Sequence, residues 1–373
     1  MTGYRMGLVA LLAAALSACG GPAAKPAAPA PQQAAAAAPA EKASEKASEK
    51  ASEQAAPAAA PENARACPPE PQVPSQEAMQ DYVQHARDHG FLWRITKGGH
   101  SSYLYGTMHV GKPEWMIPGP QTMAALRATD TMALEMDLLD PQVQAQMQQA
   151  LTSTHGAALP PALAARVQQE AEALCVPWQG VAGMPPELQL AVLEVAAGRW
   201  AGLDAAYAAD AVLAGVGHGA HKQMVSLESP ASQIHALMMK TPAETASYVE
   251  DTLKELESAE ALALLKRLAQ AWADSDFADI ESYRQWCQCE RTPAERGLMK
   301  RMLDQRNPAM AAKIDALHKK GGKVFAAVGS LHMVGAGGLP ALLKKKGYKV
   351  ERIAFAPVSS QTSAPAQAPA EAH

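Results

Sequence analysis

A short motif occurs twice in this chain, once near each end of its folded part. The first copy, Leu104–His109, reads Leu-Tyr-Gly-Thr-Met-His, and the second, Ala327–His332, reads Ala-Val-Gly-Ser-Leu-His. Each copy is an apolar run typical of a buried strand, followed by glycine, a hydroxyl residue, an apolar residue and histidine. A strand that ends at glycine delivers the next side chains to the rim of a sheet. The duplication therefore predicts two matching strand ends that each carry a histidine.

The two copies together indicate a site that neither copy would indicate alone. A single Gly-x-x-His sequence recurs by chance, and an isolated histidine is more often a satisfied core or surface residue. Two copies in matched strand contexts favour a shared role for His109 and His332. Ligand sites in open α/β sheets lie beyond the carboxyl ends of the strands, so the two imidazoles are expected to converge there.

Two glutamates fall at the same kind of position. The run Thr131–Asp137 is predicted to be a strand in which Glu135 points away from the face that carries the apolar residues. Burying a carboxylate in such an apolar run is costly unless it has a partner or a functional role. The alternative is an edge strand in which Glu135 is exposed to solvent. Glu228 directly follows a second candidate strand, Lys222–Leu227. Both glutamates are therefore expected at the sheet edge that carries the histidines.

The N-terminal segment, residues 1–19, looks like an export signal. It has one basic residue, an apolar stretch too short to span a bilayer, and small residues before Cys19. It resembles the bacterial lipoprotein signal, which implies that Cys19 becomes the lipidated N-terminus. An ordinary secretory signal with a chance cysteine is the alternative. Gly20 stands where an inner-membrane retention signal has aspartate, so the expected location is the outer membrane, facing the periplasm.

Composition divides the rest of the chain into a tether, a folded domain and a tail. Residues 20–74 are rich in Ala, Pro, Glu and Lys, residues 356–373 repeat the Ala and Pro bias, and neither segment can bury a core. Residues 75–355 suffice for one large domain or two packed halves. The net charge of −4, the lack of a strongly basic block and an aromatic content of 5% disfavour a nucleic-acid partner. The membrane, reached through the lipid at Cys19, is an expected partner.

Four cysteines remain after Cys19. An oxidising envelope favours disulfides among Cys67, Cys175, Cys287 and Cys289. The Cys-x-Cys spacing looks too tight for an easy mutual bridge, so we expect Cys287 and Cys289 to pair with Cys67 and Cys175, in one of two ways. A metal site at the Cys-x-Cys pair is the alternative, and it is disfavoured because no third soft ligand lies nearby in the sequence.

The residue types at the predicted site suit a divalent transition metal. Two neutral imidazoles and one carboxylate form a three-ligand set that leaves a position for water, and the predicted ligands are His109, His332 and Glu135. Such a metal makes its bound water acidic enough to attack a carbonyl near neutral pH. Glu135 and Glu228 are the candidate carboxylates for the general base, and Arg306 is the cation that could stabilise an oxyanion. The expected metal is Mn, Co or Zn.

These residues form part of a wider pattern that resembles the TraB/PrgY/GumN family, which includes the Tiki metalloproteases. The resemblance extends over Phe91–Ile353 and consists of Leu92-Trp93, Tyr103–His109, Glu135, Gly202-Leu203-Asp204, Leu227-Glu228, Arg306-Asn307 and Val328–His332. It implies an α/β fold, in which a mixed β-sheet core built from two related halves, each with a strand and Gly-x-x-His motif, is covered by many helices.

The resemblance also implies a site and an activity. It places His109 and His332 in the site, with Glu135 and Arg306 beside them. It also implies that Glu228 is a site residue. In the Tiki branch it implies a metal-dependent peptidase acting on peptide or protein substrates, and it connects the chain with a hydrolase superfamily that includes erythromycin esterases. The second copy departs mildly from the family, which often has small residues before the histidine.

Three functions stay open from the sequence. The first is a metal-dependent peptidase or related hydrolase of the envelope. The second is a metal-free hydrolase of the erythromycin-esterase type, in which a histidine acts as base and carboxylates orient water. The third is a binding or accessory lipoprotein that holds a ligand without turnover. Metal analysis separates the first from the second, and any turnover excludes the third.

Overall fold

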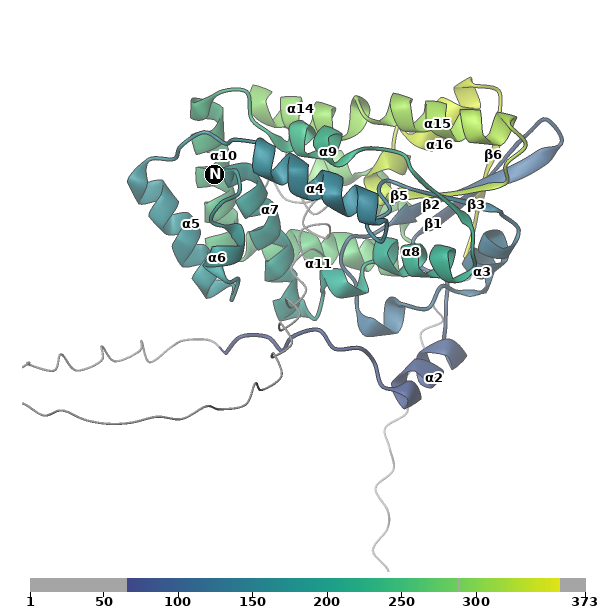
Figure 1. Ribbon diagram of the computed structural model, residues 1–373, viewed down its shortest axis with the longest axis horizontal. Helices are drawn as coiled ribbons and strands as arrows, with labels where there is room; N and C mark the ends of the chain where they lie inside the picture. Colours follow the sequence, from purple (N-terminus) through teal and green to yellow (C-terminus); the bar gives the residue numbers. More distant parts are fainter. Residues whose placement is uncertain (1–65, 288, 356–373) are drawn as a thin grey trace, which may run out of the picture. The chain divides into compact units, whose positions relative to one another are not determined.

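The computed structural model describes residues 66–287 and 289–355. The predicted export signal, Cys19, the tether to residue 65 and the tail from residue 356 lie outside the described residues. The core is one mixed sheet of six strands in the order β4-β3-β5-β2-β1-β6. The expectation of an α/β fold with a mixed sheet covered by helices is therefore confirmed (Figure 1).

The sheet has a parallel part and an antiparallel part. β3 and β4 are parallel, β3 and β5 are parallel, and β5 and β2 are parallel, whereas β1 runs antiparallel to both β2 and β6. The carboxyl ends of four neighbouring strands therefore meet at one edge. The strands are β1 (Phe91–Lys97), β2 (His100–Thr107), β3 (Thr131–Leu134), β4 (Gln223–Ser226), β5 (Val324–Gly329) and β6 (Lys349–Ile353).

Helices cover both faces of the sheet and form a separate group beside it. In Figure 1, α15 and α16 lie over one face and α3 and α8 over the other, while α5, α6, α7 and α10 pack together away from the strands. The α-helices are α2 (Gln76–Gln84), α3 (Pro120–Arg127), α4 (Pro141–Ser153), α5 (Pro161–Ala173), α6 (Trp178–Val181), α7 (Pro186–Ala197), α8 (Ala209–Gly219), α9 (Pro230–Leu237), α10 (Pro242–Glu257), α11 (Glu260–Ala273), α12 (Phe277–Glu281), α13 (Tyr283–Trp286), α14 (Pro293–Met299), α15 (Asn307–Lys319) and α16 (Leu339–Lys345).

Short helical turns connect several of these elements. The 3₁₀ turns are η1 (Pro113–Trp115), η2 (Gly198–Ala201), η3 (Ala205–Tyr207) and η5 (Ser330–Met333), and η4 (Lys300–Asp304) is a π-helical segment between α14 and α15. Proline stands in the first turn of most α-helices, where its fixed φ suits the helix and its missing N–H costs nothing. Of the helices in the described ranges, none is long and apolar enough to cross a membrane.

The strand that carries Glu135 is shorter than predicted. β3 ends at Leu134, so Glu135 is the first residue beyond the strand and not an internal one. The N–H of Leu227 donates to the carbonyl of Leu134, and that of Glu228 to the carbonyl of Glu135, so the two chains stay side by side past the strand ends. Both glutamates therefore leave the sheet at the same edge, as the sequence predicted.

The predicted disulfide pairing is wrong. Cys287 and Cys289 are bonded to each other, with their Cα atoms 5.1 Å apart. Cys287 has right-handed helical backbone angles at the end of α13, and this turn brings the two Cα atoms within the range of about 4.4–6.8 Å that a disulfide spans. Cys67 and Cys175 are each disulfide-bonded as well. All four cysteines are thus oxidised as expected, but the tight spacing does not prevent a mutual bridge.

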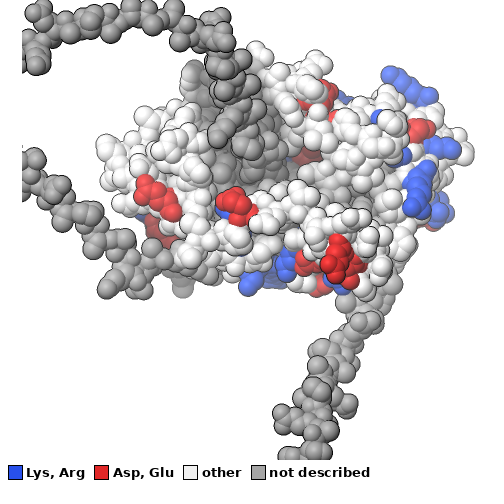
Figure 2. Space-filling model, turned by 60° about the horizontal axis from the view of Figure 1, so that its bottom comes forward, with Lys and Arg blue, Asp and Glu red and all other residues white. Residues whose placement is uncertain are grey.

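Charge is unevenly distributed on the face shown in Figure 2. Acidic side chains lie at several separate places, whereas most of the visible basic side chains gather at one end (Figure 2). Most of the visible described surface between them carries no charged side chain. This face therefore presents no continuous surface of one sign.

Candidate active site

The two Gly-x-x-His motifs lie side by side. β2 and β5 are adjacent and parallel, and their register pairs Thr107 with Gly329. A Cβ atom on Gly106 would lie 2.9 Å from Ser330 Oγ and 3.2 Å from Ser330 Cα, so only glycine permits this approach. The hydroxyl of Ser330 donates to the carbonyl of Thr107 at 2.8 Å, which joins the two motifs directly. The duplication in the sequence therefore becomes one continuous structure.

Both histidines line one pocket beyond the ends of these strands. The pocket encloses about 390 Å³ of empty space, counted out to its open mouth. Residues from both motifs form one side, and apolar side chains from α11 and α12 form the other. Trp272 of α11 also donates its indole N–H to the carbonyl of Gly106 at 2.8 Å, which fixes the first motif. The lining residues are Thr107, Met108, His109, Leu268, Trp272, Ile280, Gly329, Ser330, Leu331 and His332.

His332 is held by an amide. Its Nδ1 lies 2.5 Å from Asn307 Oδ1, and the amide nitrogen of Asn307 donates to the carbonyl of Gly337 at 2.8 Å. Because the amide oxygen can only accept, Nδ1 carries the ring proton and Nε2 keeps its lone pair. Burial, together with the positive charges of Arg306 and His109, holds the pKa of His332 well below its usual value. His332, which lines the pocket, is therefore a neutral imidazole whose Nε2 has a free lone pair.

His109 is held by a carboxylate. Its Nδ1 lies 2.7 Å from Asp210 Oδ2, and the Thr107 hydroxyl donates to the other oxygen of Asp210 at 2.6 Å. Burial alone would lower the pKa of His109, but Asp210, and to a smaller extent Glu135, outweigh it and raise this pKa. The carboxylate fixes Nδ1 as the protonated nitrogen and makes the imidazole more basic.

The remaining ring nitrogens are the most informative atoms of the site. Nε2 of His109 and Nε2 of His332 are both buried, and neither has a hydrogen-bond partner within residues 66–287 and 289–355. Buried polar atoms are nearly always satisfied, so two unsatisfied ones on histidines that line the same pocket indicate a ligand position. Glu135, the first residue after β3, places its Oε1 3.8 Å from His332 Nε2.

Glu135 and Glu228 share one arginine. The Arg306 guanidinium contacts Glu135 Oε2 at 2.7 Å and Glu228 Oε1 at 2.9 Å, and its Nη2 also contacts Glu228 Oε2. The amide of Gln233 donates to Glu135 at 2.9 Å and to Glu228 at 3.3 Å. The N–H of Gly329 donates to Glu135 Oε1 at 2.7 Å. The structure therefore connects both glutamates and the arginine to the second motif.

Arg306 is fully engaged in these contacts. Its Nη1 donates to the carbonyl of Met302 at 3.0 Å, and its other nitrogens face the two glutamates. A guanidinium held in this way positions carboxylates and is not free to stabilise an oxyanion. Burial raises the pKa of Glu135, with Glu228 adding to it, while Arg306 and His109 act in the opposite direction.

The donor set fits a divalent cation, although no complete site is preformed. Among the described residues, no group of three or more His, Cys, Asp or Glu side chains is already arranged to hold a metal ion. His109 and His332, each with an unpartnered Nε2, nevertheless line one pocket, and Glu135 Oε1 lies 3.8 Å from Nε2 of His332. The three carboxylates of Glu135, Glu228 and Asp210 outnumber the positive charges of Arg306 and of a protonated His109. A divalent cation that displaces the proton of His109 would compensate this excess of negative charge.

Asp210 and Gln233 are site residues that the sequence pattern did not predict. Asp210 lies between the Gly202-Leu203-Asp204 and Leu227-Glu228 parts of the family pattern, and apolar residues throughout this segment favour one continuous helix. Ala208 has extended backbone angles instead, so α8 starts anew at Ala209 and aims Asp210 at the first motif. The signal that could have revealed it is an acidic residue in the first turn of a helix that follows the Gly202-Leu203-Asp204 pattern.

The sequence matches the TraB/PrgY/gumN family over residues 91–352, from β1 to β6, with both histidine motifs inside the match. This chain belongs to the TraB/PrgY/gumN family. A relative named uncharacterized protein YbaP from Shigella flexneri is 27% identical over 260 residues, covering 66% of this chain and 89% of that protein. A protein of the same name from Escherichia coli (strain K12) is 26% identical over 280 residues, covering 68% and 97%. No solved structure matches this TraB/PrgY/gumN member.

Proposed function

We propose that this protein is a metal-dependent hydrolase of the bacterial envelope that acts on peptides or proteins and is anchored by a lipid at Cys19. One observation carries the catalytic part of the proposal. Two histidines from adjacent strands line one pocket, each fixed through Nδ1, and both of their Nε2 atoms are buried without a partner in the described part of the chain. This is the usual state of imidazoles that bind a metal through Nε2.

His109 and His332 would hold the metal through Nε2, and Glu135 Oε1 is the nearest carboxylate oxygen for a third ligand. Mn, Co and Zn all suit two imidazoles and a carboxylate. When bound, such an ion supplies a Lewis acid and acidifies water. Asp210 and Asn307 serve as the outer partners that fix the tautomer of each histidine.

The carboxylate cluster supplies the remaining polar groups. Glu135 Oε1 borders the histidines, so Glu135 is either the third ligand or the group that accepts a proton from water. Arg306 holds Glu135 and Glu228 together and keeps their charges compensated in a buried setting. Glu228 and Arg306 are therefore positioning residues in this proposal.

The pocket lining favours an apolar substrate side chain near the scissile bond. Leu268 and Trp272 of α11 and Ile280 of α12 line the pocket opposite the two motifs, and Leu331 lines it beside His332. Apolar side chains buried there would gain about 25 cal/mol per Å² of surface removed from water. This supports peptides that carry an aliphatic or aromatic residue next to the cleaved bond.

A metal-free hydrolase is the second candidate, and the pairing of His109 with Asp210 favours it. A histidine oriented by a carboxylate and with a raised pKa is the arrangement of a general base. In that case Nε2 of His109 would take the proton from water directly, and activity would survive removal of divalent metals.

One experiment separates the two candidates. The purified full chain is assayed for bound metal and for cleavage of a peptide library, before and after treatment with a chelator. The proposal expects about one divalent ion per chain, and cleavage that is lost with the ion and restored by Mn, Co or Zn. Undiminished cleavage by the chelated protein would establish the metal-free mechanism.

The envelope location has its own test. If Cys19 ends a lipoprotein signal, Cys19→Ala abolishes labelling with a fatty-acid probe and releases the protein from the outer-membrane fraction. Retention of an acylated Cys19→Ala protein in membranes would show that the lipoprotein interpretation is wrong.

A further inference from the structure

Lysine side chains gather at the end of the sheet opposite the histidine pocket. Residues 313–352 contain nine Lys or Arg and two Asp or Glu, although the whole chain has a net charge of −4. Figure 2 shows most of the visible basic side chains at one end of the face drawn there. The positive charge of the domain is therefore concentrated and not evenly spread.

Strand topology brings these lysines together from several segments. The parallel strands β2 and β5 begin at the same end, β2 after the turn that follows Lys97 and β5 directly after Lys323. β6 runs antiparallel to β1, so Lys349 lies at this end too. Lys346, directly after α16, lies 3.7 Å from Asp315 of α15, and its carbonyl accepts from Lys97 Nζ at 2.5 Å. We define the basic end as Lys97, Lys319, Lys320, Lys323, Lys344, Lys346 and Lys349.

The lysines of the basic end outnumber its negative charges. The carboxylates that lie here are Asp130, Asp315 and Glu351. The carboxyl-terminal ends of α15 and α16 add about half a negative charge each, which leaves an excess of about three positive charges. Lys320, Lys323 and Lys344 are exposed, and none of these three has a carboxylate within 4.0 Å among the residues that the structure describes.

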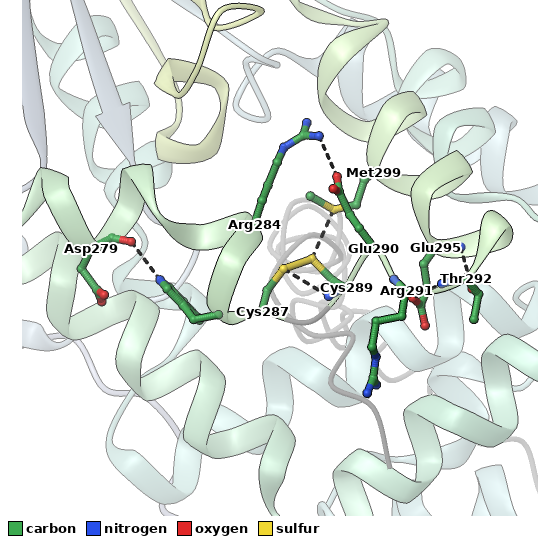
Figure 3. The surroundings of a disulfide bond; sticks show 10 residues. Asp279, Arg284, Cys287, Cys289, Glu290, Arg291, Thr292, Glu295 and Met299 are labelled. Atoms are coloured by element: carbon green, nitrogen blue, oxygen red, sulfur yellow. Dashed lines mark hydrogen bonds and ion pairs between the residues drawn. A yellow bond between two sulfur atoms is a disulfide. The ribbon is translucent and has the colours of Figure 1, made fainter. Parts of the chain in front are cut away.

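Several basic side chains in other parts of the domain are paired instead. Arg284 contacts Glu290 at 2.6 Å (Figure 3). Arg267 contacts Asp279 at 2.6 Å. Charge left without a partner at one end adds nothing to the stability of the fold, so it indicates a negatively charged partner outside the domain.

We propose that the basic end binds the anionic phospholipid headgroups of the membrane to which the lipid at Cys19 attaches the chain. A lipid anchor and a basic patch reinforce each other in membrane binding. Nucleic acid suits this surface less well. Tyr348 lies under the ammonium group of Lys97, at 5.0 Å, but it is only 4% exposed and cannot stack on a base. The choice of a membrane rests on the anchor proposed above, whereas affinity for headgroups does not.

This contact would also orient the proposed hydrolase site. The histidine pocket lies beyond the carboxyl ends of β2 and β5, and the basic end lies at their amino ends. Headgroups bound at the basic end therefore leave the pocket on the far side of the sheet from the membrane. That orientation suits soluble peptides or proteins as substrates and not membrane lipids.

The test uses the full chain with Cys19→Ala, so that no lipid is attached, and measures cosedimentation with vesicles. Vesicles of equal parts phosphatidylglycerol and phosphatidylcholine are compared with vesicles of phosphatidylcholine alone. The neutral vesicles report any binding by the apolar export signal, which all variants share. Each Lys near an anionic surface contributes about fivefold in affinity, so an excess of three charges gives about 100-fold tighter binding to the anionic vesicles. About 1 M salt abolishes the difference, because it shortens the screening length to about 3 Å.

Matched variants assign the binding to the basic end. The triple variant Lys320→Gln, Lys323→Gln, Lys344→Gln binds anionic vesicles about 100-fold less tightly and keeps the circular dichroism of the native fold, since all three side chains are exposed. The control triple variant, which loses three exposed lysines from other parts of the domain and keeps its affinity, is Lys240→Gln, Lys266→Gln, Lys300→Gln. His332→Ala keeps its affinity as well, so this result is independent of the proposed metal site.

Several outcomes would overturn the proposal. Equal affinity for the two kinds of vesicle would exclude recognition of anionic headgroups. An equal loss in both triple variants would show that net charge, and not the basic end, determines binding. A DNA duplex is measured in parallel, and a basic-end variant that loses only its affinity for DNA would assign this surface to nucleic acid. Failure of the Cys19 labelling test would leave all these affinities unchanged, so the two proposals can fail separately.

Discussion

The two Gly-x-x-His motifs begin alike in sequence and end in different environments. His109 meets the carboxylate of Asp210, whereas His332 meets the amide of Asn307. The pKa of His109 is raised by Asp210 against the effect of burial, and the pKa of His332 is lowered by burial and by the nearby positive charges. The same local backbone thus presents one imidazole that readily accepts a proton and one that stays neutral.

The hydroxyl residues of the two motifs also have different hydrogen-bond partners. The Thr107 hydroxyl donates to Asp210, so it supports the group that orients His109. The Ser330 hydroxyl donates to the carbonyl of Thr107, so it joins the two strand ends. A repeated motif therefore fixes where two imidazoles lie, while residues from other segments decide the protonation of each.

The largest expected effect is the loss of either histidine. If His109 and His332 bind one metal, His109→Ala and His332→Ala each remove most of the metal and the cleavage activity. The loss in affinity exceeds the 10–100-fold typical of an outer-shell change. Metal content is measured by mass spectrometry of purified protein. His218→Ala is the control, because His218 of α8 pairs with Asp137 and does not line the pocket. A His332→Ala protein with full metal content would contradict the shared site.

An exchange of the two partners is expected to have the next largest effect. Asp210→Asn gives His109 the amide environment of His332, so we expect its pKa to fall and the metal affinity to drop by about 10–100-fold. Asn307→Asp gives His332 a carboxylate, so its pKa rises. Titration of the histidine resonances by NMR in metal-free protein measures both changes. An unchanged pKa of His109 in Asp210→Asn would show that Asp210 does not set its protonation.

The two histidines are expected to impose opposite pH dependence on stability. His109 has a raised folded pKa, so its contribution is fully present below its unfolded pKa of about 6.5 and is lost as the pH rises through the folded pKa. His332 has a lowered folded pKa, so the unfolded chain takes up the proton first and stability falls as the pH drops below about 6.5.

Urea unfolding of metal-free protein between pH 5 and 8 checks these signs. His332→Gln reduces the loss of unfolding free energy on the acid side, and His109→Gln reduces the loss on the alkaline side. If both variants change the profile in the same direction, the environments of the two histidines do not differ as described.

The smallest expected effects concern the hydroxyl residues. Ser330→Ala and Thr107→Val each remove one buried hydrogen bond, at about 1 kcal/mol of unfolding free energy. Only Thr107→Val is expected to weaken metal binding as well, by several-fold at most, since only Thr107 supports Asp210. A weakened metal site in Ser330→Ala and an intact one in Thr107→Val would reverse the assignment of the two hydroxyls.

Strand patterns predicted the positions of the site residues more accurately than their partners. Apolar runs that end at Gly106 and Gly329, and the glutamates after β3 and β4, were enough to bring His109, His332, Glu135 and Glu228 to one sheet edge. The apolar runs and the glycines that end them are local features of the sequence, so they predict local structure well.

The partners depend on packing between distant segments, which no local pattern encodes. Asp210 reaches His109 because the chain breaks at Ala208, and Arg306 is enclosed by two glutamates and a carbonyl rather than left free. The Cys287–Cys289 bridge was mispredicted for a similar reason, because the turn at the end of α13 was not visible in the spacing.

The proposed metal site requires that Nε2 of His109 and Nε2 of His332 share one ligand position. The most direct test is anomalous diffraction from crystals of this protein soaked with Zn. We expect a single strong peak about 2.0–2.1 Å from Nε2 of His109 and from Nε2 of His332, the distance of zinc from an imidazole nitrogen. A peak bound to one histidine alone, or no peak in the pocket at a concentration that occupies other zinc sites, would contradict it.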